Sequence, residues 1–68
     1  MAIWAVKLRR PDGGRWRWVS KAGDATTVRV DAHAFESRLD ARRFAGRARD
    51  ANPGWIYLEM PITADLGN

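Results

Sequence analysis

Alternating arginine and tryptophan residues at positions 15–18 are the part of this 68-residue chain best suited to bind an anion. Successive side chains of an extended strand point to opposite faces, so Arg15 and Arg17 share one face while Trp16 and Trp18 share the other. Arginine carries a planar fork of donors that fits phosphates and base edges. The pattern predicts a sheet with its indoles in a core and its arginines facing an anionic partner.

The same alternation in residues 3–9 and 26–30 extends this basic face to the neighbouring strands. We expect the apolar side chains of all three runs to face one helix, which leaves their cations on the opposite face. Such a face is either an ordinary solvated surface or a small sheet that enters the major groove of duplex DNA. The predicted nucleic-acid-binding residues are Lys7, Arg9, Arg15, Arg17, Lys21 and Arg29.

Exposed aromatic residues are a second signal, because single-stranded nucleic acid stacks on tryptophan rings that lie among arginines. We expect Trp16 and Trp18 to point at the helix, where they are core residues rather than a stacking surface. Trp55 and Tyr57, on the outward side of the last strand, are better placed for an exposed contact. With a basic side of the helix they form a candidate surface for a protein partner: Trp55, Tyr57, Arg38, Arg42 and Arg49.

Residues for catalysis are scarce in this chain, which has one histidine, no cysteine and eight dispersed carboxylates. His33 has no acid and nucleophile near it in sequence, and we interpret it as a polar loop residue. Gly13-Gly14 is too short to cradle a phosphate, and neither a Walker nor a dinucleotide-binding pattern occurs. The sequence predicts a protein that is not an enzyme and has no cofactor or metal site.

Size and charge set the broad class. Sixty-eight residues form one small domain, and the net charge of +4 with a pI near 10.7 favours anionic partners. The absence of cysteine excludes disulfides and thiolate metal sites. No apolar run approaches the roughly 20 residues that span a bilayer, so we expect a soluble cytoplasmic protein that does not engage a membrane.

Turn residues divide the chain into a three-stranded meander followed by a helix. Pro11-Asp12-Gly13-Gly14 predicts a hairpin of residues 2–10 with 15–21. A second turn at 22–24 leads to a third strand at 26–30. Ser37 has the chemistry of an N-cap, and the spacing that follows predicts a helix over 38–51 with a small apolar stripe. The residues of that stripe are Ala41, Phe44, Ala45 and Ala48.

The helix is predicted to end at Asn52-Pro53-Gly54, before a last strand at 55–60 on the sheet edge. The order is βββαβ, an α+β fold with a mainly antiparallel sheet and one helix on one face. We expect residues 1–62 to form the domain and 63–68 to fray.

The chain resembles the arm-type DNA-binding domain of phage integrases. The resemblance is carried by two strands joined by the Pro-Asp-Gly-Gly turn, the Arg/Trp run, a third strand, and the capped helix with Ala41 and Phe44. The resemblance covers about residues 3–50. It implies a three-stranded sheet in the major groove, with DNA-reading roles for Arg15, Arg17 and Arg29. The chain also resembles small stand-alone proteins of phages and mobile elements, some of which bind and inhibit a host or defence complex.

Two functions fit these patterns. The first is a non-enzymatic nucleic-acid-binding protein that uses the basic sheet face and prefers DNA to RNA. The alternative is a phage or mobile-element interaction module that binds an acidic protein surface and modulates a host or defence complex. An exposed sheet edge would also allow two copies to pair as a homodimer.

Overall fold

The β1–β2 hairpin forms the centre of the structure, a computed structural model that describes residues 3–63 and Leu66. β1 (Trp4–Arg10) and β2 (Gly13–Val19) pair antiparallel across a turn at Pro11 and Asp12. Gly13 and Gly14 follow with φ of +109° and +100°, a region that residues with a side chain rarely adopt. The predicted hairpin is confirmed, and β2 begins two residues earlier than expected.

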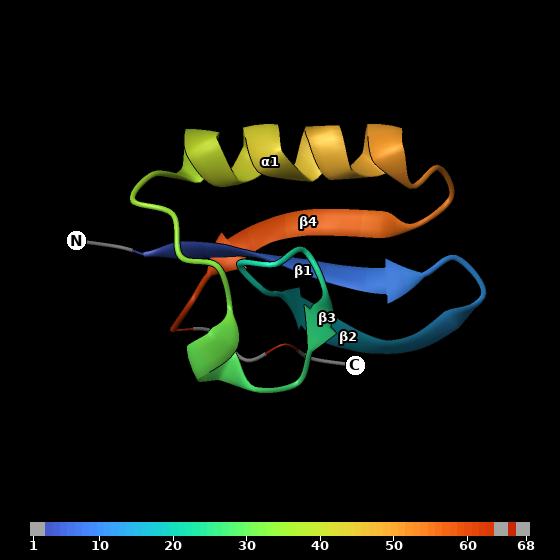
Figure 1. Ribbon diagram of the computed structural model, residues 1–68, viewed down its shortest axis with the longest axis horizontal. Coiled ribbons are helices and arrows are strands. Elements are labelled where there is room, and N and C mark those ends of the chain that lie inside the picture. Colours follow the sequence, from blue (N-terminus) through green and yellow to red (C-terminus); the bar gives the residue numbers. More distant parts are fainter. Residues whose placement is uncertain (1–2, 64–65, 67–68) are drawn as a thin grey trace.

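Two further strands flank the hairpin. β3 (Ala25–Thr26) and β4 (Ile56–Pro61) complete a four-stranded sheet of order β3-β2-β1-β4, in which every neighbouring pair is antiparallel. The helix α1 (Arg38–Ala51) packs on one face of the sheet over β4 and β1 (Figure 1). The predicted α+β fold of order βββαβ is confirmed, and β4 lies at the sheet edge as expected.

Local sequence explains the bounds of α1, which match the prediction. Ser37 caps the helix because its hydroxyl oxygen accepts a hydrogen bond from the Asp40 N–H at 3.1 Å. Ala41 and Ala45 are completely buried, and their small side chains let the helix lie close to the sheet. After Asn52, a turn through Gly54 with φ of +95° leads the chain into β4.

The third strand is shorter than the sequence suggests, so the predicted strand over 26–30 is wrong beyond Thr26. The Thr26 hydroxyl accepts a hydrogen bond from the Val28 N–H at 3.1 Å, and this local bond replaces a strand ladder. The chain then forms a short 3₁₀ helix, η1 (Arg29–Asp31). Val28 is 48% and Val30 86% exposed, and their predicted place in the core is wrong.

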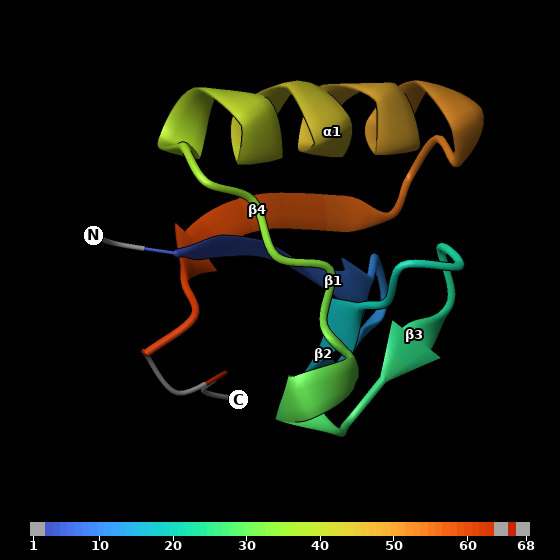
Figure 2. The same cartoon turned by 60° about the vertical axis from the view of Figure 1, so that its left-hand side comes forward.

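Apolar side chains are buried on both faces of the sheet. The cluster beneath α1 contains Val6, Leu8, Val19, Ala41, Ala45 and Tyr57, with Trp4, Phe35, Phe44 and Ala48 packed against it. A second cluster, which the sequence did not predict, lies on the opposite face and contains Ala5, Trp18, Ala32 and Met60. Ile62 and Thr63, which follow β4, turn to the side of the sheet away from α1 (Figure 2).

Ile62 and Leu66 from this last segment pack against the second cluster. The predicted fraying of 63–68 concerns, apart from Thr63 and Leu66, positions outside the described residues. Within the described part of the chain, no helix has the length and apolar character needed to cross a bilayer.

Candidate nucleic-acid interface

The register of the hairpin decides which face each of its cations occupies. Leu8 lies opposite Arg17, and Lys7 lies opposite Trp18. Opposed residues in an antiparallel pair share a face, so Arg17 is on the α1 side with Leu8 while Trp18 is on the far side. The prediction that Trp16 and Trp18 face the helix is therefore wrong. Arg10 lies opposite Gly13 across the two-residue turn, and a shift of the register between Leu8 and Arg10 then sets Leu8 opposite Arg17.

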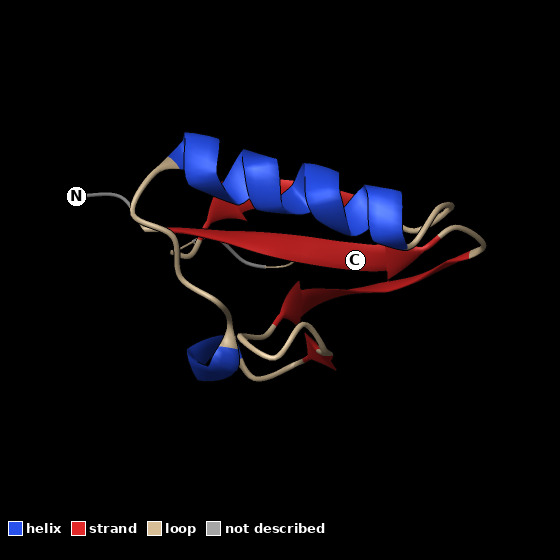
Figure 3. Ribbon diagram, turned by 45° about the horizontal axis from the view of Figure 1, so that its top comes forward, coloured by secondary structure: helices blue, strands red, loops and turns tan. Residues whose placement is uncertain are grey.

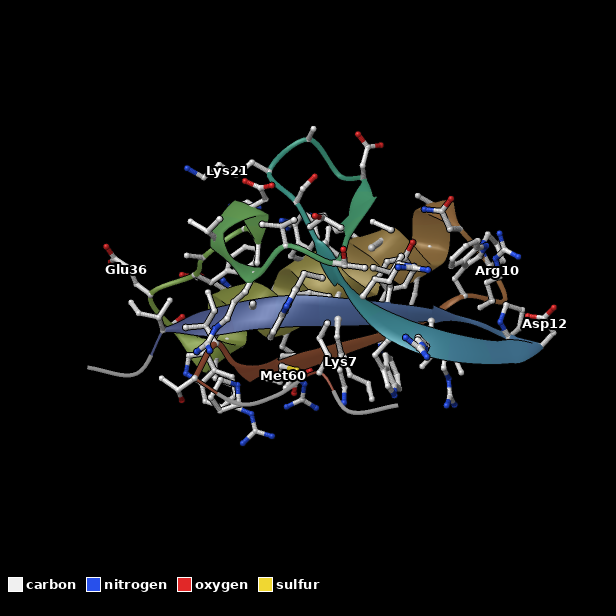
Figure 4. All side chains as sticks on the ribbon, turned by 90° about the horizontal axis from the view of Figure 1, so that it is seen from below. Lys7, Arg10, Asp12, Lys21, Glu36 and Met60 are labelled. Atoms are coloured by element: carbon white, nitrogen blue, oxygen red, sulfur yellow. The ribbon has the colours of Figure 1, made fainter. Side chains whose placement is uncertain are left out.

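On the face away from α1, Trp16 lies beneath two cations. The Lys7 Nζ is 4.3 Å and the Arg9 guanidinium carbon 4.7 Å from the indole ring, both within cation–π range. The Arg9 Nε is buried and has no hydrogen-bond partner. Figure 4 looks onto this face and shows Lys7 beside Met60. Lys7 and Arg9 thus form a cation pair held on the half-buried Trp16.

On the α1 side, three arginines gather around a hollow of about 310 Å³. α1 packs over β4 and β1, so the outer part of β2 stays open at the hairpin end. The hairpin turn and the α1–β4 loop lie at the same end of the molecule (Figures 1 and 3). The lining of this hollow, called the arginine hollow below, is Leu8, Arg10, Gly13, Gly14, Arg15, Arg17, Ala25 and Trp55.

Arg10 is a member of the arginine hollow that sequence reasoning missed. Its position two residues after Leu8 in β1 gives it the same face as Leu8, and this parity was the available signal. Trp55 is 36% exposed, as expected for an accessible aromatic residue, and its role in a partner contact stays a prediction. The hollow therefore combines an accessible indole with three guanidinium groups.

Lys21 and Arg29 lie apart from the hairpin cations. Lys21 is in the turn after β2 and Arg29 is in η1, and both line a hollow with Val30, Ala32, Ala34 and Ile62. Figure 4 shows Lys21 on the opposite side of the molecule from Arg10. The prediction that six cations share one sheet face is wrong, because the register and the 3₁₀ helix divide them into three groups.

The predicted outward position of Tyr57 is also wrong. Tyr57 lies opposite Leu8 in the β1–β4 pairing and is only 6% exposed beneath α1. Its neighbour Leu58 lies opposite Lys7 and is 41% exposed. The alternation of the last strand was correctly recognised, but its inward face was assigned to the wrong residues.

The three helix arginines that were predicted to contact a partner do not all face away from the sheet. Arg38 lies 3.6 Å from Glu59, measured from Nε to Oε1, and Arg49 donates a 2.9 Å hydrogen bond to the Tyr57 carbonyl oxygen. Both partners belong to β4. Arg42 is exposed. Two of the three proposed partner contacts on α1 therefore have intramolecular partners.

The hairpin cations are not neutralised by nearby acids. Among the described residues, the one ion pair within 4.0 Å is that of Arg38 with Glu59. Asp12, at the exposed tip, is the single acidic residue of the hairpin sequence between Trp4 and Val19. The hairpin is consequently the most concentrated source of unpaired positive charge on the strands.

His33 lies in the loop before α1, as expected from its interpretation as a polar loop residue. Its ring stacks on Phe35 with centroids 4.2 Å apart and meets Phe44 edge-on at 5.5 Å. The Nδ1 atom is buried without a hydrogen-bond partner. Across residues 3–63 and Leu66, no three metal-ligating side chains come together.

Comparisons with protein-family models, curated proteins and solved structures found no match to this chain. The resemblance to integrase arm domains and to small phage or mobile-element proteins therefore stays a prediction.

Proposed function

We propose that this protein is a non-enzymatic nucleic-acid-binding protein that prefers duplex DNA and binds it with the β1–β2 hairpin. The observation that carries the proposal is the gathering of five cations, without an acid partner among the described residues, on the two sides of one hairpin. Lys7 and Arg9 occupy one side. Arg10, Arg15 and Arg17 occupy the other.

The hairpin carries charge on both faces, and its end, beyond the pairing of β2 with β3 and of β1 with β4, is a two-stranded ribbon. The major groove of B-form DNA has a phosphate backbone along each wall, is about 12 Å wide and admits such a ribbon, whereas the major groove of A-form RNA is deep and narrow. The cations on each side of the hairpin then lie toward a different DNA strand. This arrangement replaces the single flat basic face that the sequence suggested.

The supporting experiment is a binding titration of the whole chain with a labelled duplex of about 20 base pairs, followed by fluorescence anisotropy. Contacts of four or five cations with phosphates give a log-log salt slope of about −4. We expect binding at about 50 mM salt that weakens steeply by about 200 mM. Absence of binding at the lower salt concentration would contradict the proposal.

The alternative function, a phage or mobile-element interaction module for an acidic protein surface, has less support. It relied on Trp55, Tyr57 and three helix arginines, of which Tyr57 is buried and Arg38 and Arg49 contact β4. Of the five residues predicted for this surface, Trp55 and Arg42 remain exposed without such a contact. We also propose that the protein is cytoplasmic and that two copies can pair through a sheet edge.

A further inference from the structure

We infer that the arginine hollow receives one unpaired nucleotide, with the base stacked on Trp55 and the phosphate bound by Arg10, Arg15 and Arg17. This inference rests on the proposed function and deepens it, because it assigns a chemical group to one side of the hairpin. Neither the duplex-binding proposal nor the charge of the hairpin requires it.

The size and lining of the hollow fit such a ligand. Its volume of about 310 Å³ lies at the lower end of the range of about 300–1,000 Å³ that is usual for small-molecule sites. No acidic residue lines it, and its apolar surface comes from Leu8, Ala25 and Trp55. A flat ring with a negatively charged substituent matches an indole beside guanidinium groups.

Two glycine residues border the hollow at the hairpin end. Gly13 and Gly14 belong to its lining, and a Cβ atom added at either position would have no atom within 4 Å. The backbone at these positions therefore borders open space. Their positive φ values also exclude the easy introduction of a side chain there.

The neighbourhood of Trp55 sets the orientation of the nucleotide. The backbone N–H of Trp55 donates a hydrogen bond to the carbonyl oxygen of Asn52, the C-cap of α1, so Trp55 follows directly on the helix end that carries partial negative charge. This end disfavours a phosphate and tolerates an uncharged base. The phosphate is drawn instead to Arg15 and Arg17 on β2, which are exposed and lie outside the helix end.

A base can present its face to Trp55 only when it is unstacked, because bases inside a duplex offer their edges to the grooves. Stacking of one base on an aromatic side chain contributes about 1–3 kcal/mol, which corresponds to a factor of about 5–150 in affinity. The hollow therefore predicts a preference for a duplex that contains one unpaired nucleotide.

The test compares three labelled duplexes with the full chain: a blunt duplex, the same duplex with one unpaired nucleotide at its centre, and the same bulge with an abasic site. We expect the bulged duplex to bind at least about five-fold more tightly than the blunt one. The abasic bulge keeps the backbone distortion and the extra phosphate but lacks the base. It should therefore bind like the blunt duplex.

Variants assign the preference to one indole. Trp55→Ala should bring the ratio of the two affinities close to one, and Trp55→Phe should restore part of it. Trp16→Ala, which removes an indole from the other side of the hairpin, should keep the ratio. Equal affinity of the unmodified chain for bulged and blunt duplexes, or an unchanged ratio in Trp55→Ala, would overturn the inference while leaving duplex binding intact. Failure to bind any duplex would instead overturn the proposed function together with it.

Discussion

Leu8 lies directly opposite Arg17 in the pairing of β1 with β2, and this single relationship places cations on both sides of the hairpin. It sets Arg15 and Arg17 on the side of the sheet that α1 partly covers. It also turns Trp16 and Trp18 toward the other side, where Trp18 becomes a core residue of a second cluster. Charge and burial on β2 are thus both consequences of the register.

The two tryptophans of β2 should contribute very differently to stability. Trp18 is 2% exposed, so Trp18→Ala should lower the free energy of unfolding by about 3–5 kcal/mol. Trp16 is half-buried beneath Lys7 and Arg9, and Trp16→Ala should cost clearly less. Urea unfolding monitored by circular dichroism measures both values. A larger loss for Trp16→Ala than for Trp18→Ala would contradict the register.

The N-cap of α1 provides a test of the helix boundary. Ser37→Ala removes the acceptor of the Asp40 N–H and should lower the free energy of unfolding by about 1 kcal/mol. Ser37→Asp keeps an acceptor at the same position and should retain most of the stability. The same urea titration compares the two variants. Equal stability of Ser37→Ala and the parent chain would show that the helix does not depend on this cap.

Arg49 is predicted to hold the last turn of α1 on β4. Arg49→Ala removes its 2.9 Å hydrogen bond to the Tyr57 carbonyl oxygen, and should cost about 0.5–1 kcal/mol of unfolding free energy. Arg47→Ala is the matched control, because Arg47 is exposed on the same helix and alanine favours helices. Thermal unfolding should show a lower Tm for Arg49→Ala than for Arg47→Ala. Indistinguishable Tm values would mean that the bond contributes nothing.

His33 is predicted to be replaceable without loss of stability. Its Nδ1 is buried without a partner, and leaving a buried polar atom unpaired costs about 1–3 kcal/mol. His33→Phe keeps a ring against Phe35 and Phe44 and removes the unpaired nitrogen, so the Tm should stay level or rise. Phe35→Ala, which removes the stacking partner, should lower it. A marked fall in the Tm of His33→Phe would reveal a hydrogen bond of the imidazole.

Local signals in the sequence were sufficient to predict most of the helices, strands and turns of the fold. The N-cap at Ser37, the small stripe around Ala41 and Ala45, and the turn at Gly54 act within a few residues, so their outcome follows from local chemistry. The third strand was misjudged because the Thr26 hydroxyl binds the Val28 N–H. The strand propensities of the residues alone do not reveal such a competing hydrogen bond.

The candidate site was harder to predict, because it depends on how strands pair rather than on what each strand contains. Alternation shows which residues of β2 share a face, but it does not say which face meets α1. The face is set by the two-residue turn at Pro11 and Asp12 together with the shift of the register between Leu8 and Arg10, and the alternation shows neither. The approach of Trp55 to the arginines depends on tertiary packing and has no local signal.

The central claim is that the hairpin cations bind nucleic acid, and the salt dependence of duplex binding in two double variants tests it most directly. Arg15→Ala/Arg17→Ala removes two hairpin cations, whereas Arg43→Ala/Arg47→Ala removes two exposed cations of α1 and changes the net charge equally. Each phosphate contact adds about −0.9 to the log-log salt slope. We expect the hairpin pair to make the slope shallower by about 2 and the helix pair to leave it unchanged. A slope that both pairs reduce equally, or that only the helix pair reduces, would contradict the account.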